Sequence, residues 1–183
     1  MKKHPIKILD TGAVIAEGNT HRYSLWRTWD YNLPRIMFIG LNPSRADAVY
    51  NDPTITRCIN FAAQWGYGSM YFANLFSFRT PYVHTPKIKQ DVEERWEPLI
   101  TNMHKAITND TDEHLCKMFE KSNCIVCCWG SWQIPGITLR AGFILKFIEK
   151  TGKAPYCFGT NKDGSPKHPL YLKSSAQIQI YTP

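Results

Sequence analysis

The sequence predicts an α/β domain in which a mostly parallel, four-stranded sheet is covered by helices on both faces. Short apolar runs recur along the chain, and each has the length and composition of a strand buried on both faces. Segments with the apolar spacing of helices separate these runs. Strands that alternate with helices are typical of parallel sheets, so we expect a three-layer α/β/α arrangement.

A single domain accounts for all 183 residues, because a chain of this length rarely holds two independent cores. We expect its core to span 36–173. Residues 1–33 form a small N-terminal β extension in this interpretation, since two β-like pieces flank Gly18-Asn19 as in a hairpin. The 43% hydrophobic and 20% charged content is that of a globular protein.

Four strands and four helices are predicted in the core. The strands are "IMFIGL" (36–41), "MYFANLF" (70–76), "CIVCCW" (124–129) and "PYCF" (155–158). The helices cover Pro53–Trp65, 90–108 with an interruption at Pro98, 111–121 and 137–150. Asp52 suits the N-cap of the first helix and Pro53 its first position. In the last helix Leu139, Phe143 and Phe147 recur every four residues.

The residues that follow each strand are candidates for a site, because ligands of open α/β sheets bind outside the carboxyl ends of the strands. They are Gly40, Leu41, Asn42, Pro43 and Ser44 after the first strand, Asn74, Phe76 and Arg79 around the end of the second, Trp129-Gly130-Ser131-Trp132 after the third, and His168-Pro169 at the far end of the loop after the fourth. We expect these residues to meet at one edge of the sheet.

The side chains at this edge suit the binding of a nucleobase. Asn74 carries a donor and an acceptor for the pairing edge of a base. Flat surfaces on which a base could stack are offered by Phe76, Phe78, Trp129 and Trp132. Asn42 can hold a water molecule through its amide, and His168 can donate a hydrogen bond to a developing anion. Structural roles are the alternative, because Asn42 can cap its turn and the aromatic rings can belong to the core.

Two carboxylates near the first strand are further candidates for activating water. They are Asp47 and Asp52. Asp52 has the role of a helix cap as its alternative.

The charge balance favours a polyanionic partner. The chain has 22 Lys and Arg against 15 Asp and Glu, which gives a net charge of +7 and a pI near 9.1. A basic surface without such a partner is the alternative. The residues placed to contact backbone phosphates are Arg45, Arg79, Ser131, Lys162, Lys167 and Lys173.

No apolar run approaches the roughly 20 residues of a membrane span, and no apolar stretch follows the basic start of the chain. We therefore expect a cytoplasmic protein whose six cysteines are reduced thiols. Cys124 and Cys128 fall on one face of a predicted strand and Cys127 on the other. This spacing favours buried thiols, so we expect neither a metal site nor another cofactor.

The order of these motifs resembles that of the uracil-DNA glycosylase superfamily. "FIGLNPS" resembles the first family motif, which contacts the attacked sugar and the hydrolytic water. "YFANLFSFRTP" is similar to the strand that ends in the Asn that reads the pyrimidine, and "CIVCCWGSW" to the strand and turn before the last helix. "KHPLYLK" resembles the second catalytic motif. Within the superfamily, the stretch from Ile36 to Lys173 looks closest to a group of small bacterial and phage proteins catalogued as a domain of unknown function.

The resemblance implies roles for individual positions. Asn42 stands where the efficient uracil enzymes have an Asp. An Asn at this position is found in members that position water without a carboxylate. His168 has the role of stabilising the departing base anion. Ser44 replaces a bulky Tyr and leaves room beside C5 of the pyrimidine, which suggests a large 5-substituent. Leu170-Tyr171 replaces the family's Ser-Pro, so the loop that enters the duplex differs. The implied catalytic set is Asn42, His168 and Asp52, and the implied base-binding set is Gly40, Leu41, Pro43, Ser44, Asn74, Phe76 and Trp129.

The expected function is that of a monofunctional DNA glycosylase. It would flip a modified pyrimidine out of double-stranded DNA, such as 5-hydroxymethylcytosine or its glucosylated form in phage DNA, and leave an abasic site, in DNA repair or antiphage defence. We expect no membrane, obligate protein partner, metal or cofactor. The alternatives are a DNA- or nucleotide-binding module without catalysis, and a hydrolase of free nucleosides or nucleotides.

Overall fold

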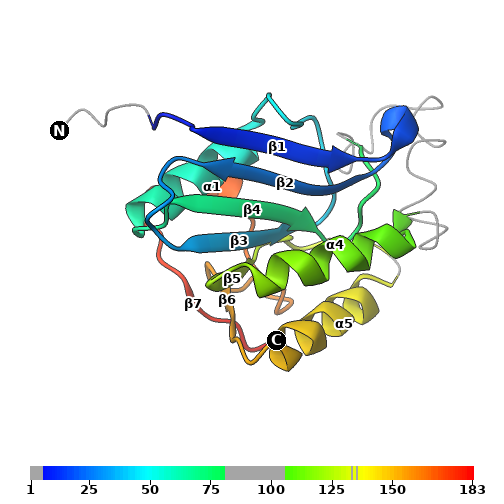
Figure 1. Cartoon of the computed structure of the whole chain (residues 1–183). Helices are drawn as coiled ribbons and strands as arrows, with labels where there is room; N and C mark the ends of the chain where they lie inside the picture. The colour runs from blue at the N-terminus through cyan, green and yellow to red at the C-terminus, as the bar shows by residue number, and fades with distance from the viewer. Residues whose placement is uncertain (1–5, 81–105, 133, 135) are drawn as a thin grey trace.

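The computed structural model describes residues 6–80, 106–132, 134 and 136–183 (Figure 1). The predicted helix around 90–108 therefore lies, except for its last residues, outside the described part of the chain. The described strands are β1 Asp10–Ile15, β2 Arg22–Thr28, β3 Arg35–Gly40, β4 Ser69–Asn74, β5 Cys124–Cys127, β6 Pro155–Cys157 and β7 Gln179–Ile180. The described helices are α1 Pro53–Gln64, α4 Asn109–Glu120 and α5 Ile137–Lys150, with short 3₁₀ turns η1 Glu17–Asn19 and η2 Pro169–Tyr171.

The mixed α/β class is confirmed, and the four predicted strands form the parallel centre of the sheet. The strand order is β1-β2-β4-β3-β5-β6-β7, and the pairs β4–β3, β3–β5 and β5–β6 are parallel. Buried apolar residues fill both faces of the central strands, as expected for strands covered on both sides.

The predicted sheet of four strands was too small, because the described residues form a sheet of seven strands. The N-terminal hairpin of β1 and β2 is confirmed, but it is part of the sheet and not a separate extension. β2 pairs antiparallel with β4, with Leu25 opposite Phe72 and Thr28 opposite Ser69. On the other side β7 pairs antiparallel with β6. Both additions satisfy backbone groups that an open edge of the parallel strands would leave unpaired.

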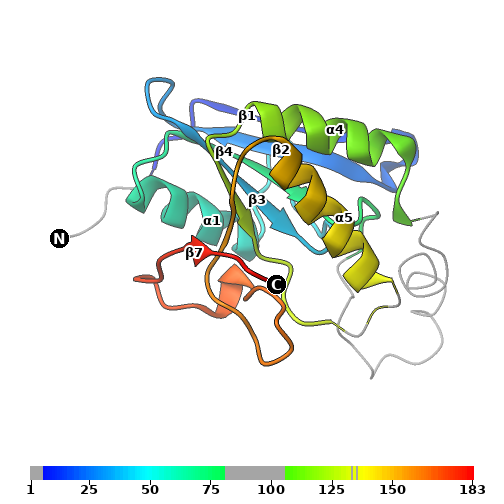
Figure 2. The same cartoon turned by 90° about the horizontal axis from the view of Figure 1, so that it is seen from below.

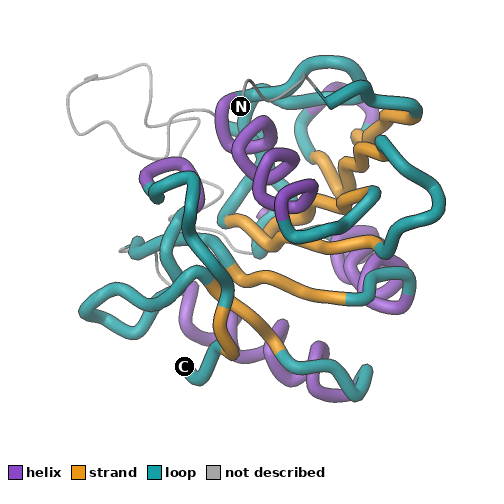
Figure 3. The backbone as a smooth tube through the Cα atoms, turned by 90° about the vertical axis from the view of Figure 1, so that its left-hand side faces the viewer, coloured by secondary structure: helices purple, strands orange, loops and turns teal. Residues whose placement is uncertain are grey.

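Alternate residues of β3 belong to two different hydrophobic clusters. Met37 and Ile39 pack in a cluster that includes α4 and α5, whereas Ile36 and Phe38 pack in a cluster that includes α1. Since successive side chains of a strand point to opposite faces, α1 lies on one face of the sheet and α4 and α5 on the other. Figures 2 and 3 show the strands between these helices.

The first and last predicted helices form at their predicted positions. The Asp52 carboxylate caps α1 by accepting a hydrogen bond from the Ile55 N–H at 2.9 Å, and Pro53 occupies the first turn. The buried face of α5 differs from the pattern that predicted the helix. Leu139 and Phe143 are exposed, and the buried apolar residues of α5 are Ile144, Leu145 and Ile148.

The cysteines follow the predicted alternation. Cys124 and Cys128 lie in the cluster on the α1 side, and Cys127 lies in the cluster on the opposite face. Burial raises the pKa of all three thiols above the usual value. Within the described ranges, no three His, Cys, Asp or Glu side chains are grouped so that they could hold a metal ion. The described helices are also too short or too polar to cross a membrane.

Candidate functional site

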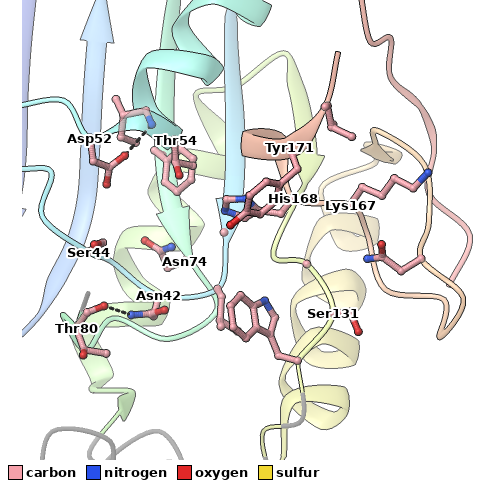
Figure 4. A pocket seen from close by; sticks show the side chains of 18 of the residues that line it. Asn42, Ser44, Asp52, Thr54, Asn74, Thr80, Ser131, Lys167, His168 and Tyr171 are labelled. Atoms are coloured by element: carbon pink, nitrogen blue, oxygen red, sulfur yellow. Dashed lines mark hydrogen bonds between the residues drawn. The ribbon is translucent and has the colours of Figure 1, made fainter. Parts of the chain in front are cut away.

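A pocket of about 480 Å³ opens where β3, β4 and β5 end, and the segment before α1 and the loop after β6 complete its walls (Figure 4). It gathers predicted residues from all of these segments. Those that line it are Gly40, Leu41, Asn42, Ser44, Asp52, Asn74, Gly130, Ser131, Trp132, Lys167 and His168. The expectation that the strand ends meet at one edge therefore describes this pocket correctly.

The Asn42 amide has a defined orientation. Its Nδ2 group donates to the Thr80 carbonyl at 2.9 Å and to the Pro43 carbonyl at 3.0 Å (Figure 4). Both amide hydrogens are therefore directed at backbone oxygens, and Oδ1 is the atom that remains as an acceptor. A side chain held in this way can accept a hydrogen bond from a water molecule and fix its position.

Three arginines hold the loop of residues 42–52 that carries Asn42. Arg22 donates to the Ala46 carbonyl at 2.9 Å, and Arg27 donates to the carbonyls of Asp47 at 2.7 Å and Tyr50 at 3.2 Å. Arg79 donates at 3.4 Å to the carbonyls of Ser44, Arg45 and Ala46. Because the loop has little regular structure of its own, these side chains supply the donors for its backbone carbonyls.

Asn74 lies in the pocket wall and is only 4% exposed. Its Oδ1 accepts a hydrogen bond from Arg22 at 3.2 Å. Its Nδ2 lies beside Gly40, where a Cβ atom would come within 2.8 Å of it. Gly40 is therefore required by the close approach of Asn74 to the end of β3.

Arg22 is a pocket residue that the sequence interpretation missed. It is 3% exposed, and burial lowers the pKa of its guanidinium to about 10, against the opposing effect of the Asp52 carboxylate. The side chain therefore stays cationic at neutral pH. The sequence around Arg22 gives no sign of this role, because Arg22 begins the second strand of an N-terminal hairpin and only the pairing of β2 with β4 brings it to the pocket.

His168 is the N-cap of η2, and its Nδ1 accepts a hydrogen bond from the Leu170 N–H at 3.4 Å. In a neutral ring this bond assigns the proton to Nε2, which makes Nε2 the donor. The loop that carries His168 is fixed at its base, because the Gly130 N–H donates to the Pro166 carbonyl and the Lys167 N–H to the Gly159 carbonyl, both at 2.9 Å. A Cβ atom at Gly130 would lie 3.4 Å from Cβ of His168.

The two candidate carboxylates have different environments. Asp52 caps α1 and also lines the pocket, so its two proposed roles do not exclude each other. Asp47 does not line the pocket. Its Oδ1 accepts from the N–H groups of Val49 and Tyr50, and these bonds lower the pKa of the carboxyl below its usual value. Asp47 therefore builds the turn in the loop and lies outside the pocket wall.

Comparison with known proteins identifies the family of the chain. Residues 22–170 match the family described as "Protein of unknown function (DUF1643)". The chain belongs to the DUF1643 family. The matched segment includes Arg22, Asn42, Asn74 and His168 of the pocket wall. It ends just before the pocket residues Tyr171 and Leu172. No curated protein and no solved structure matches the chain.

Of the aromatic residues predicted for stacking, Trp132 lines the DUF1643 pocket, and the others do not. Phe76 and Trp129 are 0% and 2% exposed and belong to the core. The aromatic side chains that line the pocket are Phe72, Trp132 and Tyr171. Phe72 could have been found from the sequence, because it precedes Asn74 by two residues on β4 and shares its face.

The predicted cationic residues fall into two groups. Arg45, Lys162, Lys167 and Lys173 are exposed, and Lys167 also lines the pocket. Arg79 instead donates inward to the 42–52 loop. Two further predicted residues have structural contacts: Ser131 donates to the Asp163 carboxylate, and the carbonyl of the buried Pro43 accepts from the Thr80 N–H at 2.9 Å.

We predict that Gly40→Ala weakens binding in the DUF1643 pocket about tenfold or more, because the new methyl group would meet Asn74 Nδ2 at 2.8 Å and ring carbons of Phe72 at 3.0 and 3.1 Å. Titration of the ligand that is proposed below, a duplex with a non-hydrolysable extrahelical base, measures this effect together with a thermal unfolding curve. Gly142→Ala is the matched control, since a Cβ there meets nothing within 4 Å on α5. Equal affinities for the two variants would contradict the prediction.

Proposed function

We propose that this DUF1643 protein is a monofunctional DNA glycosylase with the three-layer α/β/α architecture of the uracil-DNA glycosylase superfamily. Its substrate would be double-stranded DNA that carries a modified pyrimidine, such as 5-hydroxymethylcytosine or its glucosylated form. The observation that carries the proposal is the convergence of Asn42, Asn74 and His168 on one pocket. They come from three separate chain segments and offer an acceptor for water, a base-reading amide and a donor for an anion.

The proposed reaction uses these groups in defined roles. The base leaves the duplex at a cost of a few kcal/mol, which contacts in the pocket partly offset. A water molecule that donates to Asn42 Oδ1 attacks C1′ as the glycosidic bond breaks, and the bonding electrons leave with the base. His168 Nε2–H donates to the resulting base anion and stabilises it. Asp52 lines the pocket, and in this proposal its carboxylate accepts the proton of the attacking water.

The wall beside Asn42 supports a substrate with a substituent at C5. Ser44 lines the pocket and is a small side chain. Its backbone carbonyl is held by Arg79, so the position of the residue is fixed. We propose that this wall accommodates the 5-substituent.

Base release from defined duplexes tests the proposal. Duplexes with uracil, a thymine mismatch, 5-hydroxymethylcytosine or its glucosylated form are incubated with the protein and then treated with alkali. We expect alkali-labile sites from at least one of them, and none with Asn42→Ala. Asn60→Ala, on the exposed side of α1, is the matched control. Full activity of Asn42→Ala, or no labile site with any modified pyrimidine, would contradict the proposal.

Lys167 makes the monofunctional character testable, because it lines the pocket and an amine can attack C1′ in place of water. We propose that water is the nucleophile. Borohydride should therefore trap no covalent complex between the protein and DNA, and no strand should break without alkali. A trapped complex that disappears in Lys167→Arg would show the reaction to proceed through an imine.

The salt dependence of DNA binding distinguishes the exposed lysines from Arg79. Lys173→Ala is expected to reduce the slope of log Kd against log salt concentration by about 0.9, because one phosphate contact is lost. Arg79→Ala is expected to lower the melting temperature and leave this slope unchanged, since its guanidinium holds the 42–52 loop. Fluorescence anisotropy with duplex DNA at several salt concentrations measures the slopes. A smaller salt slope in Arg79→Ala with an unchanged slope in Lys173→Ala would contradict the proposed DNA contacts.

A further inference from the structure

Arg22 forms hydrogen bonds with two separate segments of the pocket wall. Its guanidinium donates to the Ala46 carbonyl at 2.9 Å, in the loop that carries Asn42, and to Asn74 Oδ1 at 3.2 Å, on the neighbouring strand β4. Arg22 itself lines the pocket and is almost completely buried. A buried guanidinium with its donors at two defined acceptors is a rigid part of the wall.

This contact determines which way the Asn74 amide points. A guanidinium has five N–H donors and no acceptor, so it can face only the oxygen of the amide. A flipped Asn74 would place its NH₂ group against the N–H groups of Arg22, with no hydrogen bond between them. The Nδ2 donor is therefore directed away from Arg22 and toward Gly40, another residue of the pocket wall. Figure 4 shows Asn74 on the left of the view with Asn42 and Ser44, on the side of the pocket opposite Lys167.

We propose that Arg22 is a positioning residue that determines base specificity by locking the Asn74 amide with its donor toward the ligand. The proposal rests on the proposed function, in which the ligand is an extrahelical pyrimidine. Without Arg22 the amide can turn over and pair with either arrangement of donor and acceptor on a base. With Arg22 it presents one arrangement only.

The locked amide distinguishes two classes of pyrimidine. A 4-oxo pyrimidine offers an acceptor at C4 and a donor at N3, whereas a 4-amino pyrimidine offers a donor at C4 and an acceptor at N3. If both bases bind in the same pose, one of them forms hydrogen bonds with the Asn74 amide. The other base places its donor against the donor of the amide and its acceptor against the acceptor of the amide. Unpaired buried polar groups are costly, so we expect the wild-type protein to bind one class at least about tenfold more tightly.

A binding experiment tests this step without base release. The probes are two otherwise identical duplexes that carry 2′-deoxy-2′-fluorouridine or 2′-deoxy-2′-fluorocytidine opposite an abasic analogue. The fluorine disfavours cleavage, and the missing partner base favours flipping. The readout is the ratio of the two Kd values, which a uniform loss of stability does not change. The variants are Arg22→Gln, Asn74→Asp and, as matched control, Arg79→Gln, because Arg79 also donates to the Ala46 carbonyl but has no hydrogen bond to Asn74.

We expect Arg22→Gln to bring the ratio close to one, because the amide of Asn74 is then free to turn over. Arg79→Gln should keep the wild-type ratio. Asn74→Asp keeps the shape of the side chain and accepts only, so it should shift the ratio about tenfold or more toward the 4-amino probe even if Arg22→Gln does not fold. A wild-type ratio near one, an unchanged ratio in folded Arg22→Gln, or no shift in Asn74→Asp would overturn the inference. Discrimination without base release would support this inference and contradict the proposed function.

Discussion

His168→Ala is expected to lower the single-turnover rate of base release about 10²- to 10³-fold, with DNA affinity nearly unchanged. The Nδ1 atom accepts from the Leu170 N–H, so the hydrogen on Nε2 is directed to donate elsewhere. A donor to a charge that develops only in the transition state contributes to the rate and little to ground-state binding. Rapid-quench measurement of abasic sites, with protein in excess over DNA, gives this rate directly.

A second substitution separates the donor role of His168 from its role as a cap. His168→Asp can still accept from the Leu170 N–H and so keep the η2 turn, but its carboxylate cannot donate to a base anion. It should therefore be at least as inactive as His168→Ala. The control is His114→Ala, because His114 stacks on Tyr23 with ring centroids 5.4 Å apart and is not among the pocket residues. Near wild-type activity of His168→Asp would show that His168 acts only as a cap.

Arg27→Ala is expected to lower the free energy of unfolding by about 3 kcal/mol or more. Arg27 is 1% exposed, and it donates to the Asn51 side chain at 2.7 Å as well as to the carbonyls of Asp47 and Tyr50. Truncation removes the donor of these part-buried hydrogen bonds and opens a cavity in the space of a large buried side chain. Urea unfolding followed by tryptophan fluorescence measures the loss.

The same substitution should also affect the pocket, because Arg27 supports the loop between Asn42 and Asp52. We expect base release to fall together with stability. Arg35→Ala is the control: Arg35 is half-buried and donates to Ser69 Oγ and Tyr71 Oη, both at 3.0 Å, at the end of the sheet away from the pocket. Its cost should be about 1 kcal/mol. Equal losses of stability in the two variants would show that the 42–52 loop does not depend on Arg27.

The sequence predicted the elements whose signals are local. The apolar runs of β3, β4 and β5 and the Asp52-Pro53 start of α1 are patterns within a few residues, and each was found in the predicted place. The edge at which Asn42, Asn74 and His168 meet followed from a general rule about parallel sheets. These predictions required no knowledge of distant contacts.

The features that depend on distant pairing could not be predicted. Arg22 and Arg27 reach the pocket loop because β2 pairs with β4, and no local pattern shows that an N-terminal hairpin joins the sheet. Arg79 was predicted to contact DNA phosphates, but its guanidinium donates to the carbonyls of the 42–52 loop. Phe76 was predicted to offer a surface for stacking, but β4 ends at Asn74 and Phe76 packs in the core.

The most direct test of the proposed function is mass spectrometry of the bases that the protein releases from genomic DNA. Phage DNAs with unmodified, hydroxymethylated and glucosylated cytosine are incubated with wild-type protein and with Asn42→Ala, and the small-molecule fraction is analysed. We expect a free modified pyrimidine from one of the modified DNAs with the wild-type protein, and none with Asn42→Ala. Absence of a free base from every modified DNA, although the protein binds that DNA, would contradict the proposal that this pocket cleaves a glycosidic bond.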